Sequence, residues 1–412
     1  MKRIASFAAA TTLVAACAIT TTLAQPATAS APGAADAVRD WNAITMSTVL
    51  AASTPITAQP LFLTYVHRAV YNAVRSSLSH DGVSAQAAVV AAAHDVLSAD
   101  FPAQRGVLDA DYTQAVDGIP VGPARSKGLR TGALAARQLL ADRTNDGRDG
   151  PVIPAPTPGV GVWTPTPPNV VGVTSWLGQV RPFVIRSSTQ FRAAPPPALT
   201  SSTWARDYNE VRLYGSATST LRTAQQTEVA RFWGDPPYVQ NQAALRTYTA
   251  THGLDVLHTA QLFALADTAA ADALITCFET KYHYEFWRPV GAIPAGDSDG
   301  NAATPGDPRW QPLLPTPNHP EYASAHGCAT GAMATVIAGL TSRSGTGLDL
   351  YLSSTNTGTT HHFTSLSQLL DEVANARIWA GLHYRFSTTA GVRIGQAVAR
   401  VVLRHEQCGS CR

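Results

Sequence analysis

Eleven prolines fall between Pro151 and Pro197, and this stretch limits most strongly what the chain can fold into. Proline lacks an N–H and clashes with the preceding helical turn, so the stretch cannot be a helix. It also contains Trp163, Trp176, Phe183 and Phe191, which make it too apolar for a free linker. We therefore expect a long loop laid over the surface of a folded domain, in preference to a linker between two domains.

On both sides of this segment the sequence predicts helices. Apolar residues recur at helical spacing, and strand signals are sparse. With 412 residues and 45% hydrophobic content, the chain can bury a sizeable core. We predict an all-α protein with one domain over 30–412. Its expected helices are 40–52, 61–77, 84–97, 121–140, 203–213, 221–233, 254–286, 328–340, 365–383 and 388–405.

The N-terminus has the layout of an export signal. Lys2 and Arg3 precede an apolar, alanine-rich run, and Ala-Thr-Ala at 27–29 fits a cleavage site. We expect 1–29 to be a signal peptide and the mature protein to be secreted. A competing interpretation is a lipoprotein box that ends in Cys17, which would anchor the protein through that residue. No later stretch reaches the ~18 apolar residues of a membrane span. A net charge of +2 is too small to indicate nucleic acid as a partner.

The first of three clusters of polar residues is Lys-Tyr-His-Tyr-Glu-Phe-Trp-Arg-Pro at 281–289. Lys281, one of only three lysines in the chain, lies seven residues before Arg288. On a helix the two cations would share one face, and Pro289 would end that helix. Two cations on one face are costly unless an anion or a carboxylate lies against them. The alternative is a surface ion-pair face, with Glu285 bridging to Lys281.

The second cluster is Pro-Asn-His-Pro-Glu-Tyr-Ala-Ser-Ala-His-Gly at 317–327, which leads into an apolar helix. Ser324, the amide of Ala325 and His326 therefore lie at or near a helix N-terminus. Free N–H groups and the helix dipole make that end a ready anion site. The alternative is that Ser324 is an ordinary helix cap, which leaves His326 unexplained.

The third cluster, at 376–387, holds Arg377 and His383. These two residues are six apart, so they do not share a helix face. They would still converge if an anion lies near the helix end, or if Gly381 lets a neighbour approach closely. The alternative is that His383 is a hydrogen-bonded core residue.

Together the clusters resemble the Lys-x6-Arg-Pro, Pro-Ser-Gly-His and Ser-Arg-x5-His-x3-Asp motifs of the type 2 phosphatidic acid phosphatase and vanadium haloperoxidase superfamily. Order and spacing agree, with 35 residues between Arg288 and Ser324 and 50 between His326 and Arg377. The stretches 221–233 and 286–293 are similar to the soluble vanadium-dependent haloperoxidase branch. The resemblance covers about 35–405, has its motif core at about 254–405, and implies a helical bundle.

The resemblance also implies a role for each motif residue. His383 would be the vanadium ligand of a peroxidase or the nucleophile of a phosphatase, and it must be neutral for either. His326 would be the acid–base group. The vanadate or phosphate oxygens would be bound by Lys281, Arg288, Ser324, the Ala325 amide and Arg377.

Several positions depart from the family pattern. Ala323 and Ala325 replace the usual Pro and Gly, and Ala376 replaces Ser. Ser387 stands where the family has an Asp that orients the histidine. Either Ser387 itself or another carboxylate would have to take over that role.

By resemblance, the function is a vanadate-dependent haloperoxidase that uses hydrogen peroxide, a halide and a small organic acceptor. His319 and Phe278 would contribute to a halide pocket. His319 falls where bromide-oxidising relatives carry histidine, which favours bromide or iodide over chloride. Two alternatives stay open: a secreted acid phosphatase that takes phosphate through a phosphohistidine, and an inactive oxyanion-binding relative. The sequence does not indicate an oligomeric state.

Four cysteines follow the expected signal peptide, and an even number suggests disulfides in an oxidising compartment. Cys408 and Cys411 would form a local bridge at the C-terminus. Cys277 and Cys328 flank two of the motifs, four residues before Lys281 and two after His326. If the motifs converge, these two cysteines could form a second bridge.

Overall fold

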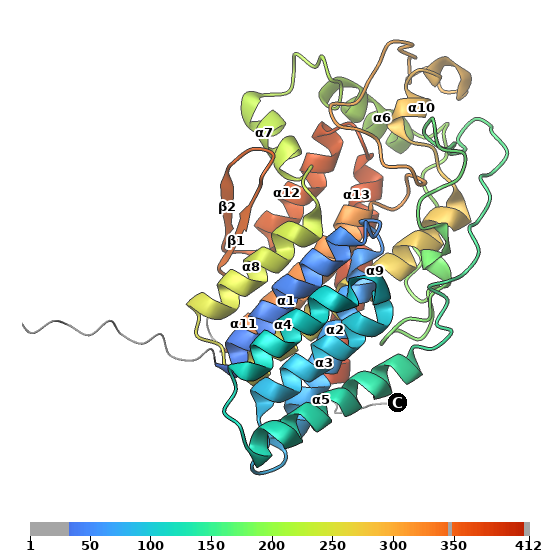
Figure 1. Ribbon diagram of the computed structural model, residues 1–412. Helices are drawn as coiled ribbons and strands as arrows, with labels where there is room; N and C mark the ends of the chain where they lie inside the picture. The colour runs from blue at the N-terminus through green and yellow to red at the C-terminus, as the bar shows by residue number, and fades with distance from the viewer. Residues whose placement is uncertain (1–32, 345–347, 408–412) are drawn as a thin grey trace, which may run out of the picture. The chain divides into compact units, whose positions relative to one another are not determined.

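Helices carry almost the whole fold (Figure 1), which confirms the all-α prediction. The computed structural model describes residues 33–344 and 348–407, so the expected signal peptide, Cys17, Cys408 and Cys411 lie outside the described residues. The α-helices are α1 (Ala34–Ala51), α2 (Gln59–Leu78), α3 (Ala85–Asp100), α4 (Arg105–Asp117), α5 (Pro123–Asp142), α6 (Ser202–Tyr214), α7 (Ala224–Phe232), α8 (Pro237–Thr251), α9 (Val256–Tyr284), α10 (Pro289–Ala292), α11 (Ala325–Ser344), α12 (Leu366–Trp379) and α13 (Arg385–Gln407).

The long helix α9 is the centre of the bundle. Its residues from Leu262 to Phe278 are buried on all sides, because alanines, leucines and small polar residues occupy every face. The helices α2 and α11 pack directly on α9, α13 packs on both α9 and α11, and α3 and α5 pack on α2. One continuous hydrophobic core therefore runs from the N-terminal helices to α13.

By length and composition alone, α9 is long and apolar enough to cross a membrane, although no such stretch was expected from the sequence. Its apolar window has a mean hydropathy of 1.3, and 94% of that window is buried among the other helices. Burial of this kind is typical of the core helix of a soluble protein.

Close contact between α11 and α13 places the start of α11 against the start of α13. A Cβ on Gly391 would lie 2.4 Å from the carbonyl oxygen of Ser324, and one on Gly395 would lie 2.3 Å from that of Cys328. Only glycine allows two helix backbones to approach so closely. The Ser324 end of α11 is thereby held beside α13.

Replacing Gly395 with alanine should lower the free energy of unfolding by about 2 kcal/mol or more, because the added methyl group forces α11 and α13 apart. Urea denaturation would measure the change. The matched control is Gly106→Ala in α4, where a Cβ would meet nothing within 4 Å. That variant should be neutral or slightly stabilising. Equal stability of the two variants would show that the helix crossing can relax.

The proline-rich segment is a loop, as predicted, with one 3-10 turn at Ser175–Gln179 (η2). Asp272 of α9 fixes it by accepting the backbone N–H groups of Phe183, Val184 and Ile185 at 2.7, 2.8 and 3.1 Å. Figure 1 shows the green segment running beside α9 and α10. It is therefore a fixed cover on the bundle and not a linker.

Three helices, α4, α8 and the four-residue α10, and a hairpin were not predicted. Helix α4 fully buries only Leu108, while Tyr112, Ala115 and Val116 pack partly buried against the core at helical spacing, so its apolar stripe is narrow and was missed. Helix α8 begins at a pair of prolines and has many polar residues. The antiparallel hairpin pairs β1 (Leu350–Ser353) with β2 (Thr360–Phe363).

Candidate active site

Lys281 and Arg288 of the first cluster come together because the chain reverses direction after α9, and not because they share a helix face. Helix α9 ends at Tyr284, and Glu285 takes a left-handed conformation (φ 46°), so Arg288 lies beyond the helix as the N-cap of α10. The expected shared face was therefore wrong. Lys281 Nζ instead donates to the carbonyl oxygens of Pro320 and Glu321 at 2.8 and 2.9 Å.

Lys281 is also not part of a surface ion pair. Its side chain is fully buried, and no ion pair within the described ranges joins it to Glu285. Burying an ammonium group without a carboxylate partner is costly. That cost is typical of a site that receives an anion from solution.

Arg288 connects the three clusters. Its Nε donates to the His319 carbonyl at 2.9 Å, and one terminal nitrogen donates to His319 Nδ1 at 2.9 Å. The other terminal nitrogen reaches the Leu382 carbonyl at 3.0 Å and His383 Nε2 at 3.3 Å. A guanidinium can only donate, so His383 Nε2 must be the lone-pair nitrogen of its ring.

Glu321 holds His383 in that tautomer. His383 Nδ1 lies 2.8 Å from Glu321 Oε1 and donates to it, and the same oxygen accepts the backbone N–H of Tyr384 at 3.1 Å. Glu321 is completely buried, and burial raises the pKa of its carboxyl to about 7. Glu321 is thus a carboxylate that contacts and orients His383, where the family pattern would have placed an Asp at 387.

Ser387 is a lesser partner of the histidine. Its Oγ lies 3.5 Å from His383 Nδ1, at the limit of a hydrogen bond, and it also contacts the Glu321 carbonyl at 3.4 Å. From the sequence, a carboxylate other than an Asp at 387 was a possible partner of His383, but Glu321 was not identified as that partner. The available signal was an acidic residue three positions before Ser324, in a segment where every neighbour is apolar or belongs to a motif.

The loop after α12 brings Arg377 and His383 together. The expected helix 365–383 ends earlier, at Trp379, in a Schellman motif. Gly381 (φ 79°) donates to the Ile378 carbonyl, and Leu382 donates to that of Arg377 at 3.1 Å. A Cβ on Gly381 would lie 2.5 Å from the Gly215 carbonyl, so a neighbour does approach closely there, as the sequence suggested.

Ser324 lies directly before α11, and the alternative that it is an ordinary cap is wrong. Its carbonyl accepts the N–H of Cys328 at 3.0 Å, which makes it the N-cap residue. An N-cap serine usually turns its hydroxyl to the first turn. Here the buried Oγ has no hydrogen-bond partner. It is therefore available to a bound group, beside the free N–H groups that begin with Ala325.

Arg377 and His326 complete the site. One terminal nitrogen of Arg377 donates to the Trp233 carbonyl at 2.8 Å, whereas its buried Nε has no partner. His326 is half-buried. Burial, with the charges of Arg377, Arg288 and Lys281, holds its pKa well below the usual range. The ring is therefore neutral at pH 7.

Electrostatics in the site favour an anion. Burial lowers the pKa of Lys281 to about 8, that of Arg288 to about 10 and that of Arg377 to about 9. Burial and these charges push the pKa of His383 well below its usual range. The site thus holds three cations that are charged at neutral pH and one carboxyl group, Glu321, that is only partly ionised there.

These features fit a tetrahedral oxyanion such as vanadate or phosphate. The buried Ser324 Oγ and Arg377 Nε are donors without a partner, and an oxyanion would satisfy both. Lys281 and Arg288 supply further charged donors. His383 offers an unprotonated Nε2. The predicted motif residues therefore lie together, while their individual roles stay predictions.

Phe278 and His319 also lie at this site. Their rings pack together with centroids 5.3 Å apart, and Arg288 holds the His319 ring. A cavity of about 400 Å³ leads to Arg288 and is lined by Trp163, Trp287 and the loop at 158–167. The proline-rich segment therefore forms part of the approach to the site.

The expected bridge between Cys277 and Cys328 is not formed, because both are free, buried thiols. A hydrogen bond joins the two side chains, and Cys277 Sγ also donates to the Ala323 carbonyl at 3.4 Å. The motifs do bring the cysteines together, as expected, but as thiols.

The affinity of the site for sulfate, whose charge is fixed near neutral pH, should fall as the pH rises above about 8. A bound anion favours the charged form of Lys281, so binding above this pH takes up a proton. Without a bound anion, the titration of Lys281 makes the stability of the fold change with pH in the opposite direction. Between pH 8 and 10.5 the unfolded chain holds a proton that folded Lys281 has lost, so this group makes stability rise with pH.

Calorimetric titrations in buffers of different ionisation enthalpy would measure the proton uptake. Lys281→Met should bind sulfate more weakly and with much less proton uptake near pH 8, where Arg377 and Arg288, with pKa values of about 9 and about 10, are still charged. Identical uptake by the wild type and Lys281→Met would assign the titration to another group.

Comparison with known proteins gives a family match for the C-terminal part of the chain. Residues 261–408 match the family described as VCPO second helical-bundle domain. Vanadium chloroperoxidase from Curvularia inaequalis is 28% identical over 271 residues, which are 49% of this chain and 44% of that protein. The match thus spans less than half of the length of this relative.

Solved structures show the same fold over most of the chain. The first bacterial vanadium-dependent iodoperoxidase superposes with a TM-score of 0.74 at 22% identity, over 90% of this chain and 96% of that one. A holo-type bacterial vanadium-dependent chloroperoxidase gives 0.67 at 16% identity, over 85% and 92%. The chain thus has the fold of the bacterial vanadium-dependent haloperoxidases, and its C-terminal part, 261–408, is similar to the VCPO second helical-bundle domain family.

Proposed function

We propose that this protein is a vanadate-dependent haloperoxidase, which uses hydrogen peroxide to oxidise a halide. One observation carries the proposal: Glu321 fixes His383 as a neutral imidazole with its Nε2 lone pair turned into a buried cluster of cations. A neutral imidazole nitrogen is a common ligand for transition metals. The surrounding donors match the oxygens of the oxyanion form of vanadium.

Each residue would have a distinct task. His383 would bind vanadate through Nε2, and Lys281, Arg288 and Arg377 would neutralise its oxygens, with further hydrogen bonds from Ser324 Oγ and the Ala325 amide. When bound, vanadate supplies the activation of hydrogen peroxide for halide oxidation. His326 is neutral, so its ring can accept a proton from the incoming peroxide.

We further propose bromide or iodide as the preferred halide. The His319 and Phe278 rings pack together beside Arg288, and by the family resemblance His319 falls at a position that is histidine in bromide-oxidising relatives. The relatives include a protein named iodoperoxidase and others named chloroperoxidase. A side-by-side assay with chloride, bromide and iodide would order the three.

Export from the cytoplasm is part of the proposal. It rests on the positive, apolar and small-residue order of 1–29. Mass spectrometry of the mature N-terminus would decide between a chain that begins at Ser30 and one that begins at a lipidated Cys17.

The deciding experiment is oxidation of a phenol-type halogen acceptor by the purified protein with bromide and hydrogen peroxide, with and without vanadate. Turnover that requires vanadate and disappears in His383→Ala would support the proposal. If instead there is no halide oxidation and vanadate inhibits hydrolysis of a phosphate monoester, the chain is a phosphatase. Failure of both assays, with vanadate still bound, would indicate the inactive relative.

A further inference from the structure

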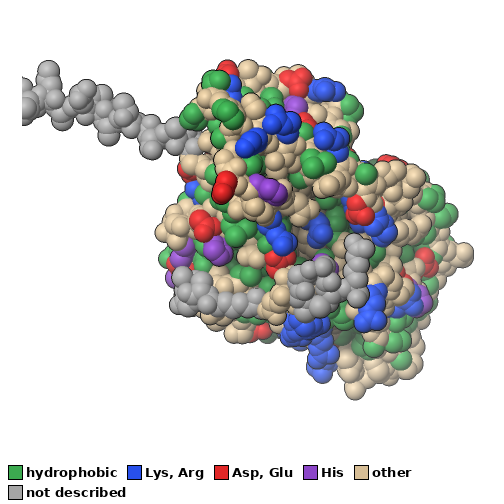
Figure 2. Space-filling model, turned by 90° about the horizontal axis from the view of Figure 1, so that it is seen from below, with side chains coloured by type: hydrophobic (Ala, Val, Ile, Leu, Met, Phe, Trp, Pro, Cys, Tyr) green, Lys and Arg blue, Asp and Glu red, His purple; other side chains and the backbone are tan. Residues whose placement is uncertain are grey.

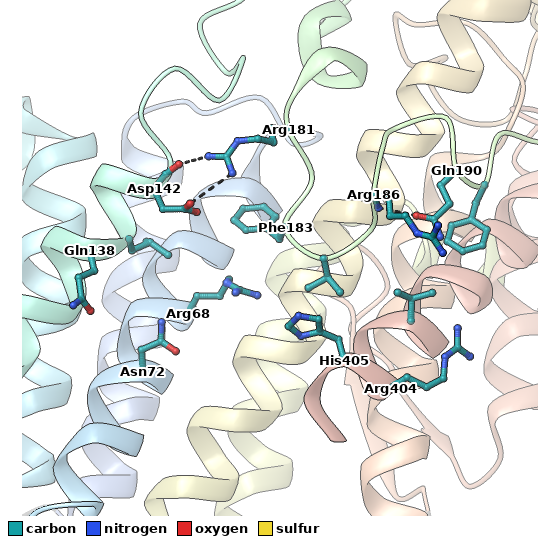
Figure 3. Close-up of a pocket in the computed structure, with 14 residues that line it drawn as sticks. Arg68, Asn72, Gln138, Asp142, Arg181, Phe183, Arg186, Gln190, Arg404 and His405 are labelled. Carbon is teal, nitrogen blue, oxygen red and sulfur yellow. Dashed lines mark hydrogen bonds and ion pairs between the residues drawn. The ribbon is translucent and has the colours of Figure 1, made fainter. Parts of the chain in front are cut away.

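A second cavity lies away from the candidate active site. It has a volume of about 1030 Å³, and four elements line it: α2, α5, the segment 181–191 and the end of α13 (Figure 3). The candidate active site adjoins the beginning of α13, at His383 and Ser387. Arg385 and Arg404 are nineteen residues apart on this helix, which corresponds to about 28 Å. The two sites therefore lie near opposite ends of α13.

Positive charge dominates this cavity. Arg68, Arg181, Arg186 and Arg404 line it, together with a single acidic residue, Asp142. Arg181 pairs with Asp142, with an N–O distance of 3.6 Å, and Figure 3 shows this contact at one edge. Three arginines are left without a carboxylate. Figure 2, viewed from the same end of the bundle, shows Lys and Arg side chains recurring across this face.

The three remaining arginines have no acceptor among the described residues. No hydrogen bond or ion pair involves the side chain of Arg68, Arg186 or Arg404. The Arg68 guanidinium lies over the ring of Phe183, with 5.8 Å from its carbon to the ring centroid. Guanidinium groups that converge on a cavity repel each other, and an anion placed between them removes that repulsion.

Two carboxylates near Arg68 are already occupied. Asp272 accepts three backbone N–H groups of the segment 183–185. Glu406 accepts from Tyr71 Oη and from Gln261 Nε2. Both act on the charge of Arg68 from a distance, but neither accepts a hydrogen bond from its guanidinium, which stays open to a ligand.

The remaining walls are apolar or amide. Phe183, Phe191, Leu139 and Val401 provide flat or aliphatic surface, and the amides of Asn72, Gln138 and Gln190 provide hydrogen bonds. Small-molecule sites combine apolar walls with a few polar groups in this way, and the volume is that of a site for a ligand of nucleotide size. Free inorganic phosphate would leave most of these walls without a contact.

We propose that this cavity binds an organic polyanion, with at least two negative charges at one end and an aromatic body at the other. Arg68, Arg186 and Arg404 bind the charged end, and Phe183 and Phe191 pack against the aromatic body. This site is separate from the candidate active site and does not depend on the proposed activity.

Calorimetric titration with three probes tests the proposal on the full mature protein: adenosine diphosphate, pyrophosphate and adenosine. Adenosine diphosphate should bind, pyrophosphate should bind at least tenfold more weakly, and adenosine should bind least. Saturating vanadate should leave these affinities unchanged, because it occupies the other site. Loss of binding with vanadate would place the probe in the candidate active site and overturn the proposal.

Arginine variants locate the binding. Arg404→Gln and Arg186→Gln change exposed residues and should fold, and each should weaken adenosine diphosphate at least tenfold. Arg400→Gln is the matched control, an exposed arginine one turn earlier on α13 that does not line the cavity. It should change the affinity less than twofold. Equal weakening by all three variants, pyrophosphate as strong as adenosine diphosphate, or no binding by any probe would overturn the proposal.

Discussion

Glu321→Gln should reduce vanadate-dependent turnover and vanadate affinity by roughly 100-fold, although it changes the site by a single charge. The Glu321 carboxylate can only accept hydrogen bonds, so it requires the proton of His383 to be on Nδ1. A glutamine amide can donate to Nδ1 and so permit the other tautomer. In that tautomer Nε2 carries the proton and can no longer bind vanadium. Steady-state kinetics and direct vanadate titration would measure the two losses.

A second substitution tests whether Glu321 positions His383 or only stabilises the fold. Ser387→Asp, introduced into the Glu321→Gln variant, puts a carboxylate one helical turn after His383, where Ser387 Oγ already lies 3.5 Å from Nδ1. We expect the double variant to bind vanadate at least tenfold more tightly than Glu321→Gln alone. The control Glu285→Gln removes a partly exposed carboxylate near the site and should have little effect. If Glu321→Gln keeps wild-type affinity, Glu321 does not set the tautomer.

Arg288→Lys should cost about 3 kcal/mol of vanadate binding, a loss of about 100-fold, and should also lower the melting temperature. The guanidinium donates to two carbonyls and to one ring nitrogen each of His319 and His383. An ammonium group has three donors without the planar fork, so it cannot reach all four acceptors. The buried carbonyl oxygens left behind would be unsatisfied.

Thermal unfolding with and without vanadate would show both effects of this change. Arg393→Lys is the matched control, because Arg393 is exposed on α13 and the substitution preserves charge in the same way. We expect it to leave the melting temperature and the vanadate-induced stabilisation unchanged. An Arg288→Lys variant with wild-type vanadate stabilisation would contradict the central role that the contacts give to Arg288.

By itself, the sequence determined the fold class and named most of the motif residues that lie together. Helical spacing of apolar residues predicted most of the helices, because burial of one face leaves a period along the chain. The prolines of 151–197 excluded a helix through a local steric rule. The three motifs named the residues that meet, because the chemistry of oxyanion binding restricts residue types. A helix with only a narrow, partly buried apolar stripe, as in α4, was missed.

Only the tertiary structure decided how those residues meet and which groups are free. The left-handed residue at Glu285 and the Schellman turn at Gly381 end α9 and α12 early, and these two reversals create the site. Packing across 62 residues of sequence places Glu321 on His383, and no spacing rule marks such a pair. Whether Ser324 caps its helix likewise depends on the surroundings of its hydroxyl. Local patterns record what a residue can do, whereas long-range contacts decide which of its possible partners it has.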